Sequence, residues 1–290
     1  MLLGFDDYEP QSRVLAEAMG MPYQIVQRHY FPDGESKLTL PSSLPGHVIF
    51  CRSLDHPNDK LLELLLAAKT ARDLGAKVLT LVAPYLCYMR QDRAFHPGEV
   101  VSQGIVGNFL ADLFDNVITV DPHLHRIQFL HQAVPATHAV SLSATSLMAE
   151  FLRERLKDPI LMGPDSEAEQ WVAAVAKPDQ WQYGVCKKIR TGDREVEISL
   201  PEINLQGRTV VIVDDVASSG QTLAVATGKC LSRGARQVDV LVTHALFAHD
   251  AKQSLLQAGV REIWSTDSVS HESNIIPLHG LLKDAVLSLA

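Results

Sequence analysis

Two adjacent carboxylates and a loop of small hydroxyl residues lie close together in the sequence and could bind a phosphorylated sugar. Asp214 and Asp215 follow an apolar, β-branched run at 210–213, which is typical of a strand buried in a parallel sheet and should end near the acids. Residues 218–222 form the loop, and an amphipathic helix pattern follows it. Amides at a helix N-terminus attract a phosphate, whereas carboxylates repel it. We therefore expect the acids to accept hydrogen bonds from sugar hydroxyls or to contact a metal.

This stretch resembles the loop that binds 5-phosphoribosyl-1-diphosphate (PRPP) in the type I phosphoribosyltransferase fold. That fold occurs in phosphoribosyltransferases and in ribose-phosphate diphosphokinases, also called PRPP synthetases. The resemblance implies a ribose 5-phosphate site made of Asp214, Asp215, Ser218, Ser219, Gly220, Gln221 and Thr222. Many members have glycine where this chain has Gln221, and glycine reaches positive φ more easily. The alternative is a buried strand followed by a capped helix, with two solvated carboxylates.

Two further segments resemble ATP-binding motifs of the PRPP synthetases. Residues 31–35, Phe-Pro-Asp-Gly-Glu, could by themselves be only a turn. In the family a similar turn stacks its aromatic ring on adenine, which implies ATP contacts for Phe31, Asp33 and Glu35. Residues 88–92, Tyr-Met-Arg-Gln-Asp, match a family motif that implies ATP contacts for Arg90 and Gln91, although a solvated loop is the alternative. The residues that follow look like the archaeal branch of the family.

Acidic and imidazole groups at two other expected strand ends could contact a metal. His123 and His125 lie close to an Asp, although a single His is more often a packed or surface side chain. The resemblance places His123 near the Mg²⁺ of Mg–ATP and gives His125 no role. It also implies that Asp165 binds metal or pyrophosphate. The glycines that usually follow this Asp are replaced here by Ser and Glu.

A run of cations at 187–190 precedes a polar segment that is typical of a hairpin. Such a run is most often a solvated face, but in an acidic chain it indicates a flap that grips phosphates. The family has a Lys-x-Arg pair at the root of its catalytic loop. The resemblance therefore implies catalytic roles for Lys188 and Arg190.

The composition indicates a packed, acidic protein. Of the 290 residues, 46% are apolar and 21% are charged, which predicts folded domains rather than disorder. A net charge of −8 argues against a nucleic-acid surface. The four cysteines form no metal-binding pattern, and neither a signal peptide nor a membrane segment is visible. We expect a cytoplasmic protein that binds neither nucleic acid nor membrane.

Short segments recur in the same order about 160 residues apart, which indicates an internal duplication. Residues 75–78 resemble 234–238, and residues 46–50 resemble 207–211. Strand patterns alternate with helix patterns in both halves. The expected fold class is α/β, with two tandem copies of a phosphoribosyltransferase-like domain, each a mainly parallel sheet flanked by helices. We place an N-terminal, ATP-side domain at 1–141 and a C-terminal domain with the ribose 5-phosphate loop at 142–290.

The resemblance extends over nearly the whole chain and implies a ribose-phosphate diphosphokinase. This enzyme transfers the β,γ-diphosphoryl group of ATP to the 1-hydroxyl of ribose 5-phosphate, with Mg²⁺ as cofactor. It also implies a homo-oligomer with the ATP site at a subunit interface. Two alternatives stay open, which are a non-catalytic regulatory subunit and a phosphoribosyltransferase that consumes PRPP.

Overall fold

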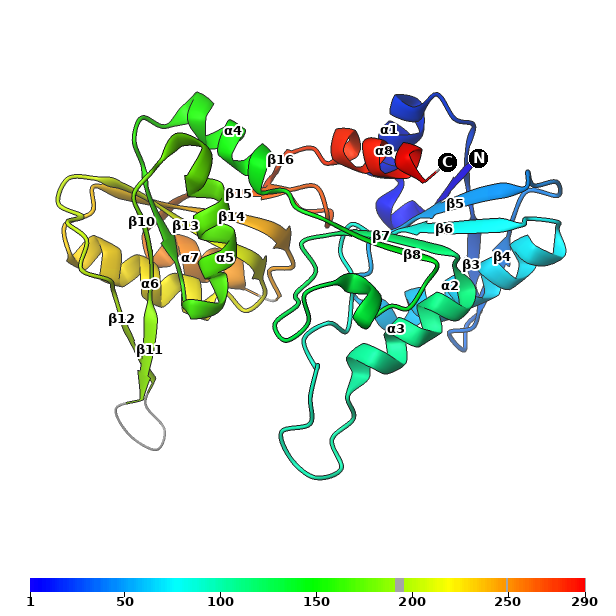
Figure 1. Ribbon diagram of the computed structural model, residues 1–290, viewed down its shortest axis with the longest axis horizontal. Helices are drawn as coiled ribbons and strands as arrows, with labels where there is room; N and C mark the ends of the chain where they lie inside the picture. The colour runs from blue at the N-terminus through cyan, green and yellow to red at the C-terminus, as the bar shows by residue number, and fades with distance from the viewer. Residues whose placement is uncertain (191–195, 249, 290) are drawn as a thin grey trace. The chain divides into compact units, whose positions relative to one another are not determined.

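The computed structural model describes residues 1–190, 196–248 and 250–289, with only the backbone given for 188–190, 196 and 197. The chain divides into two compact units (Figure 1). The first consists of Met1–Leu142, Ser268–Ser270 and the residues from Leu278 on. The second consists of Ser143–Asp267 and His271–Pro277.

A six-stranded parallel sheet forms the centre of the first unit. Its strands are β1 (Leu2–Gly4), β2 (Tyr23–Ile25), β5 (His47–Cys51), β6 (Val78–Val82), β7 (Asn116–Val120) and β8 (His138–Leu142). The spatial order is β2-β1-β5-β6-β7-β8. All five residues of β7 are buried, as expected for a parallel strand with helices on both faces of its sheet.

The second unit repeats this arrangement. Its sheet consists of β9 (Ile160–Gly163), β10 (Tyr183–Val185), β13 (Thr209–Ala217), β14 (Gln237–Ala245), β15 (Val260–Thr266) and β16 (Asn274–Ile276). The spatial order is β10-β9-β13-β14-β15-β16, again parallel throughout. When the strands are matched by their order in the chain, the two sheets have the same topology. The predicted duplication is therefore confirmed.

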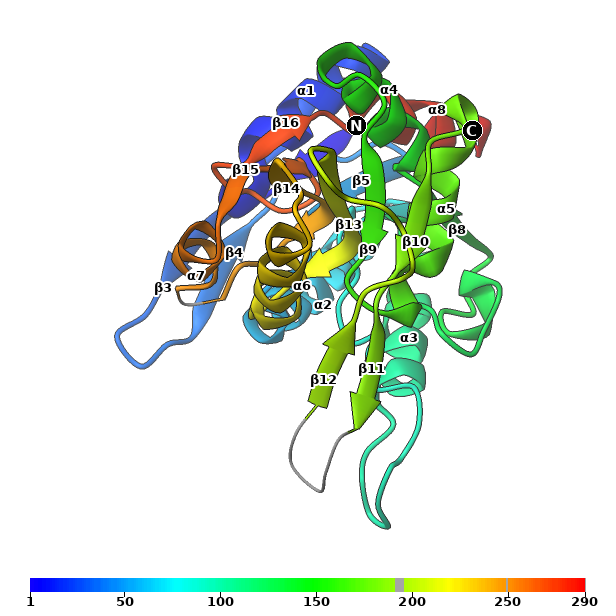
Figure 2. The same cartoon turned by 90° about the vertical axis from the view of Figure 1, so that its left-hand side faces the viewer.

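An antiparallel hairpin follows the second strand of each unit (Figure 2). In the first unit it consists of β3 (Gln27–Tyr30) and β4 (Ser36–Thr39), and in the second of β11 (Lys187–Arg190) and β12 (Val196–Ser199). The two hairpins thus occupy matching positions in the duplicated topology.

Helices connect the parallel strands. Two of these helices belong to a different unit from the strand that precedes them in the chain. The helices are α1 (Glu9–Met19), α2 (Pro57–Asp73), α3 (Ser102–Leu113), α4 (Thr145–Arg155), α5 (Glu169–Ala176), α6 (Gln221–Ser232), α7 (Ala251–Gln257) and α8 (His279–Ser288). Short 3₁₀ segments lie at Asp6–Tyr8, Leu130–Gln132, Ser166–Ala168 and Lys177–Asp179. Helix α4 follows β8 yet packs on α5 in the second unit, and α8 follows β16 yet packs on α1 in the first. The limits drawn from the sequence, 1–141 and 142–290, place α8 in the second domain.

Each unit has its own apolar core. The first gathers around residues of β5 and β6 such as Phe50 and Leu81, and the second around residues of β13 and β14 such as Ile212 and Val240. These side chains are fully buried, which fixes the carboxyl ends of the strands that carry the candidate site residues. Among the described residues, no helix combines the length and apolar character needed to cross a membrane.

Candidate active site

The acidic pair lies inside strand β13 rather than beyond its end. We expected the strand to stop near Asp214, but it continues to Ala217 because its neighbour β14 is equally long and pairs with it through Val216↔His244. Asp214 and Asp215 are therefore consecutive residues within the strand, and their side chains interact with each other. Asp214 is half-buried, and Asp215 is 3% exposed.

Asp214 lies among other acids. Burial raises the pKa of Asp214 well above its usual value, and the charges of Asp215 and Asp165 act in the same direction. Its Oδ1 accepts a hydrogen bond from the amide of Asp215 at 3.0 Å. The cluster is suited to a cation or to several hydroxyl donors, because either would offset the repulsion among the carboxylates.

A glycine brings the loop after β13 into helix α6. Gly220 is the N-cap residue with φ 72°, and its carbonyl accepts the amide of Ala224 at 2.8 Å. A Cβ at this position would lie 3.3 Å from the carbonyl oxygen of Ala251. The segment after β14 also stabilises the loop, since the amide of Ala248 donates to the carbonyl of Ser218 at 3.0 Å. The first amides of α6 have no partner within the helix, which suits them to bind an anion.

Glutamine at position 221, where many family members have glycine, fits the backbone of this loop. Gln221 is the first residue of α6, and the positive φ falls on Gly220 instead. The side chain of Gln221 is exposed, and Thr222 follows it in the first helical turn. Ser219 is exposed as well. Glutamine at position 221 is therefore not required to adopt a positive φ.

Asp165 follows the neighbouring strand β9 and lies at the same carboxyl edge of the sheet. It is the N-cap of a 3₁₀ segment, where its Oδ1 accepts the amide of Glu167 at 3.0 Å. Ser166 and Glu167 form this segment, so the glycines usual in the family are not needed for the turn. After burial and Asp215, the charge of Asp165 is a further cause of the raised pKa of Asp214, so the two carboxylates repel each other electrostatically.

In the first unit, the segments after β6 and β7 are joined by an ion pair. Arg126 contacts Asp92 through its guanidinium. Arg90 is exposed and Gln91 half-buried in the same segment as Asp92. His123 is half-buried and its Nε2 contacts that of His125. The structure thus brings Arg90, Gln91 and His123 onto two linked loops.

Backbone strain marks both of these loops. Tyr88 has φ 60° and Asp121 has φ 38°, values that non-glycine residues seldom adopt. Tyr88 also donates a hydrogen bond to Asn58 at the start of α2. Strained residues at strand ends persist where the surrounding structure holds them, and they gather at functional sites.

The turn at 31–35 forms the exposed tip of the β3–β4 hairpin. The amide of Phe31 donates to the carbonyl of Glu35 at 2.8 Å, and Gly34 has φ 93°. The side chain of Asp33 accepts the amide of Glu35 at 3.2 Å. Phe31 is 43% exposed, and its ring packs edge-to-face with the ring of His29, with 5.1 Å between the two ring centroids. An exposed ring on a closed turn is suited to stack on a planar base.

Comparison with known proteins identifies the family. Residues 1–113 match the N-terminal domain of ribose phosphate pyrophosphokinase, and residues 132–278 match the phosphoribosyl transferase domain. Ribose-phosphate pyrophosphokinase of Saccharolobus solfataricus is 34% identical over 272 residues, which cover 91% of this chain and 91% of that protein. The chain belongs to the ribose-phosphate pyrophosphokinase family.

Further members of the family match almost the full chain. The ribose-phosphate pyrophosphokinase of Methanopyrus kandleri is 34% identical over 282 residues, which cover 96% of this chain and 95% of that protein. Phosphoribosylpyrophosphate synthetase from Mycobacterium smegmatis has the same fold, with a TM-score of 0.86 at 20% identity over 100% of this chain and 98% of that one. The expected α/β fold of two tandem phosphoribosyltransferase-like domains is confirmed, as is the resemblance to archaeal members.

The cation pair of the family motif lies at the limit of the described residues. Lys188 and Arg190 belong to β11 and pair with Ile198 and Val196 of β12. Their side chains, and residues 191–195 beyond them, lie outside the described part of the chain. The catalytic roles expected for Lys188 and Arg190 stay predictions.

An ion cluster in the first unit was missed from the sequence. Arg52 follows β5, at the position that matches the acidic pair after duplication, and its side chain is 0% exposed. It contacts Asp7 and Glu63, each at 2.6 Å. A buried cation with two carboxylate partners therefore stands in the first unit where the second unit has its acidic pair. The sequence signal was a lone arginine directly after an apolar strand, where charged residues are buried only when paired.

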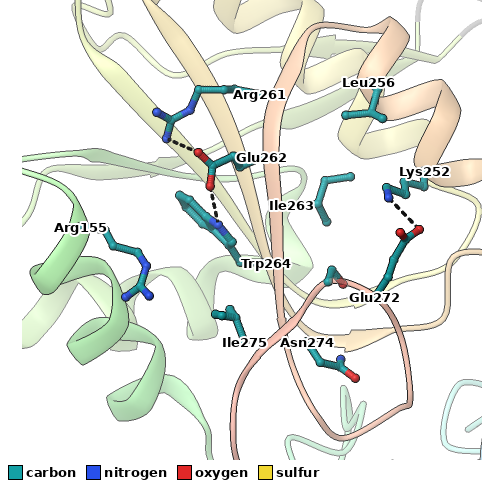
Figure 3. Close-up of a pocket in the computed structure, with 11 residues that line it drawn as sticks. Arg155, Lys252, Leu256, Arg261, Glu262, Ile263, Trp264, Glu272, Asn274 and Ile275 are labelled. Carbon is teal, nitrogen blue, oxygen red and sulfur yellow. Dashed lines mark hydrogen bonds and ion pairs between the residues drawn. The ribbon is translucent and has the colours of Figure 1, made fainter.

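The second unit also contains a pocket of about 490 Å³ that is lined by none of the family's motif residues. Residues of α4, α7, β15 and β16 surround it (Figure 3). Within it, Lys252 contacts Glu272 at 2.7 Å, and Glu262 contacts both Arg261 at 3.7 Å and the indole of Trp264 at 3.0 Å. We assign this pocket no role in the family's reaction.

Proposed function

We propose that this chain transfers the β,γ-diphosphoryl group of ATP to ribose 5-phosphate and thereby forms PRPP and AMP. The observation that carries the proposal is its similarity to curated ribose-phosphate pyrophosphokinases over both halves, at 34% identity across 96% of the chain. The acidic pair beside a helix N-terminus in the second unit supports it independently.

Ribose 5-phosphate would bind at the end of β13. Its phosphate would accept hydrogen bonds from the first amides of α6 and from the hydroxyls of Ser218, Ser219 and Thr222, with Gly220 shaping the turn. Asp214 and Asp215 would accept hydrogen bonds from the ribose hydroxyls. Because Asp214 is crowded by other acids, hydroxyl donors would relieve that repulsion.

ATP would bind to the first unit. Phe31 would stack on adenine, with Asp33 and Glu35 contacting the nucleotide. Arg90 would neutralise phosphate charge, and Gln91 would donate from the same loop.

The reaction breaks a phosphoanhydride bond of ATP and forms a phosphate ester bond to ribose. The 1-oxygen of ribose attacks the β-phosphorus, the bond from that phosphorus to the oxygen of the α-phosphate breaks, and AMP leaves with that oxygen. The hydroxyl proton is released. Lys188 and Arg190 would stabilise the charge that develops on the transferred group, so positioning and electrostatics supply most of the rate.

Mg²⁺ is the cofactor that this proposal requires. Asp165, whose carboxylate lies with Asp214 in an acidic cluster, offers the oxygen ligands that Mg²⁺ prefers, and His123 offers a nitrogen. Bound Mg²⁺ neutralises phosphate charge.

We also propose a homo-oligomer with the Phe31 turn at a subunit interface. The four free, buried cysteines further support a reducing compartment such as the cytoplasm.

One assay tests the proposal against its alternatives. The purified chain is incubated with Mg–ATP and ribose 5-phosphate, and AMP and PRPP are measured by chromatography. We expect both products in equal amounts. A regulatory subunit would form neither, whereas a phosphoribosyltransferase would consume PRPP only when a base is added.

A further inference from the structure

Glu63 is a buried carboxylate of α2 that accepts hydrogen bonds from three side chains. Its side chain is 1% exposed. Its Oε2 accepts from Nη2 of Arg52 at 2.6 Å and from Nη1 of Arg28 at 3.0 Å, and its Oε1 accepts from the hydroxyl of Tyr30 at 3.0 Å. A carboxylate stays buried only where such donors replace water. Glu63 therefore bonds hairpin β3–β4 to the core of the first unit, together with Asp6 and Asp7, which also accept hydrogen bonds from Arg28.

The core side of this contact is fixed. Arg52 donates from Nη2 to Oδ2 of Asp7 at 2.6 Å and from Nε to the same oxygen at 3.1 Å. Its guanidinium lies 4.1 Å from the ring centroid of Phe5. Because neighbours hold Arg52 on several sides, Glu63 has a fixed orientation toward the hairpin.

The hairpin side of the contact is next to the adenine turn. Arg28 and Tyr30 lie two residues apart on β3, so their side chains point to the same face and both reach Glu63. Phe31 follows Tyr30 directly. Burial, and the hydrogen bond to Glu63, raise the pKa of Tyr30, so its hydroxyl keeps its proton at neutral pH and remains a donor. A rotation of the hairpin would break these bonds and leave Arg52 as the one remaining donor of the three, which is unfavourable because a buried carboxylate needs donors in place of water.

We propose that Glu63 is a positioning residue for ATP, which holds the β3–β4 hairpin so that Phe31 meets the adenine ring. The inference rests on the proposed function of the Phe31 turn. Glu63 itself touches no substrate. Its effect should therefore fall on ATP recognition and leave ribose 5-phosphate recognition in the second unit unchanged.

Steady-state kinetics of Glu63→Gln and Tyr30→Phe test this role. Glutamine turns an amide group toward two guanidinium groups, so we expect the KM for ATP to rise about tenfold. Tyr30→Phe removes one neutral donor, and we expect a rise of about threefold. The KM for ribose 5-phosphate should stay within about twofold in both. Thr39→Ala, at an exposed position of β4, is the matched control and should change neither constant.

Hydrogen exchange without substrates provides a second readout that does not depend on activity. We expect the amides of β3 and β4 to exchange faster in Glu63→Gln than in the wild type, while those of β13 and α6 are unchanged. If both KM values rise together, or if exchange in the hairpin is unaltered, Glu63 has no positioning role. Should Glu63→Gln fail to fold, Tyr30→Phe decides by the same measurements. Absence of PRPP formation by the wild type would overturn the proposed function, and the exchange experiment would still test the anchoring of the hairpin.

Discussion

Arg126 forms an ion pair with Asp92 and thereby joins the loop after β7 to the loop after β6. Asp92 is 5% exposed, so the pair is partly shielded from water even though Arg126 is 46% exposed. These loops carry His123 on one side and Arg90 and Gln91 on the other. A contact between them fixes the groups that we propose for ATP binding.

We expect Arg126→Gln to raise the KM for ATP about fivefold, because a shielded ion pair is worth more than an exposed one. The KM for ribose 5-phosphate should not change. Arg153→Gln, which breaks an exposed pair with Asp179 in the second unit, is the control and should leave both constants alone. Equal effects of the two substitutions would contradict a role for the Arg126–Asp92 pair.

The turn into α6 gives a second prediction. Gly220 has φ 72°, and a Cβ at this position would lie close to Ala251. Gly207 has φ 70°, but a Cβ there would have no atom within 4 Å. Both Gly→Ala variants carry the cost of an unfavourable φ, on the order of 1 kcal/mol. Only Gly220→Ala also displaces the proposed phosphate site.

We therefore expect Gly220→Ala to raise the KM for ribose 5-phosphate at least about tenfold, and Gly207→Ala to lower only the melting temperature. Kinetics and thermal unfolding of the two variants separate these effects. If Gly207→Ala impairs ribose 5-phosphate recognition as strongly, the cause is general instability rather than the loop.

Much of the fold could be predicted because its signals are local. The apolar run before Asp214 predicted a buried strand, and the resemblance of residues 75–78 to 234–238 predicted two copies of one unit. The end of β13 could not be placed, since the strand is prolonged by pairing with β14, which lies far along the chain. The docking of α8 on α1 was hidden for a similar reason, because the apolar face of a helix does not specify which partner covers it.

The buried ion cluster shows the same limit for the candidate site. Arg52 looks like a surface residue in the sequence, and its partner Asp7 is separated from it by 45 positions. Only the fold reveals that Glu63 connects them to the hairpin. Motif residues, by contrast, could be named from sequence because ligand chemistry constrains their types.

The acidic cluster predicts an unusual pH dependence of stability. Burial, with the charges of Asp215 and Asp165, raises the pKa of Asp214, so the folded state binds this proton more tightly than the unfolded chain. The stabilisation is complete below about pH 4 and is lost as the pH rises toward the folded pKa. At neutral pH the ionised carboxylate of Asp214 therefore destabilises the folded, ligand-free protein, and Asp214→Asn removes this destabilisation.

We expect Asp214→Asn to raise the melting temperature at pH 7 by roughly 2–4 °C for each kcal/mol of relief, and the difference to shrink toward pH 4. Its PRPP formation should fall at least about 100-fold. Asp115→Asn should instead lower the melting temperature at pH 7, because the ionised form of Asp115 stabilises the folded state. Burial tends to raise the pKa of Asp115, but the amide of Leu79 and the guanidinium of Arg72 outweigh it and lower that pKa. A neutral or destabilising Asp214→Asn at pH 7 would show that the cluster is already compensated.

The cations of β11 give the last prediction. Lys188→Ala should lower kcat by roughly two to four orders of magnitude while ATP binds with nearly unchanged affinity, since the charge it would neutralise develops mainly in the transition state. Lys187 precedes it on the same strand and is exposed. Lys187→Ala is thus a control with the same loss of charge and should retain turnover within about twofold. Titration calorimetry with ATP separates binding from turnover in both variants. Near-normal kcat in Lys188→Ala, or an equal loss in Lys187→Ala, would remove the assignment and leave the basic run as a solvated face.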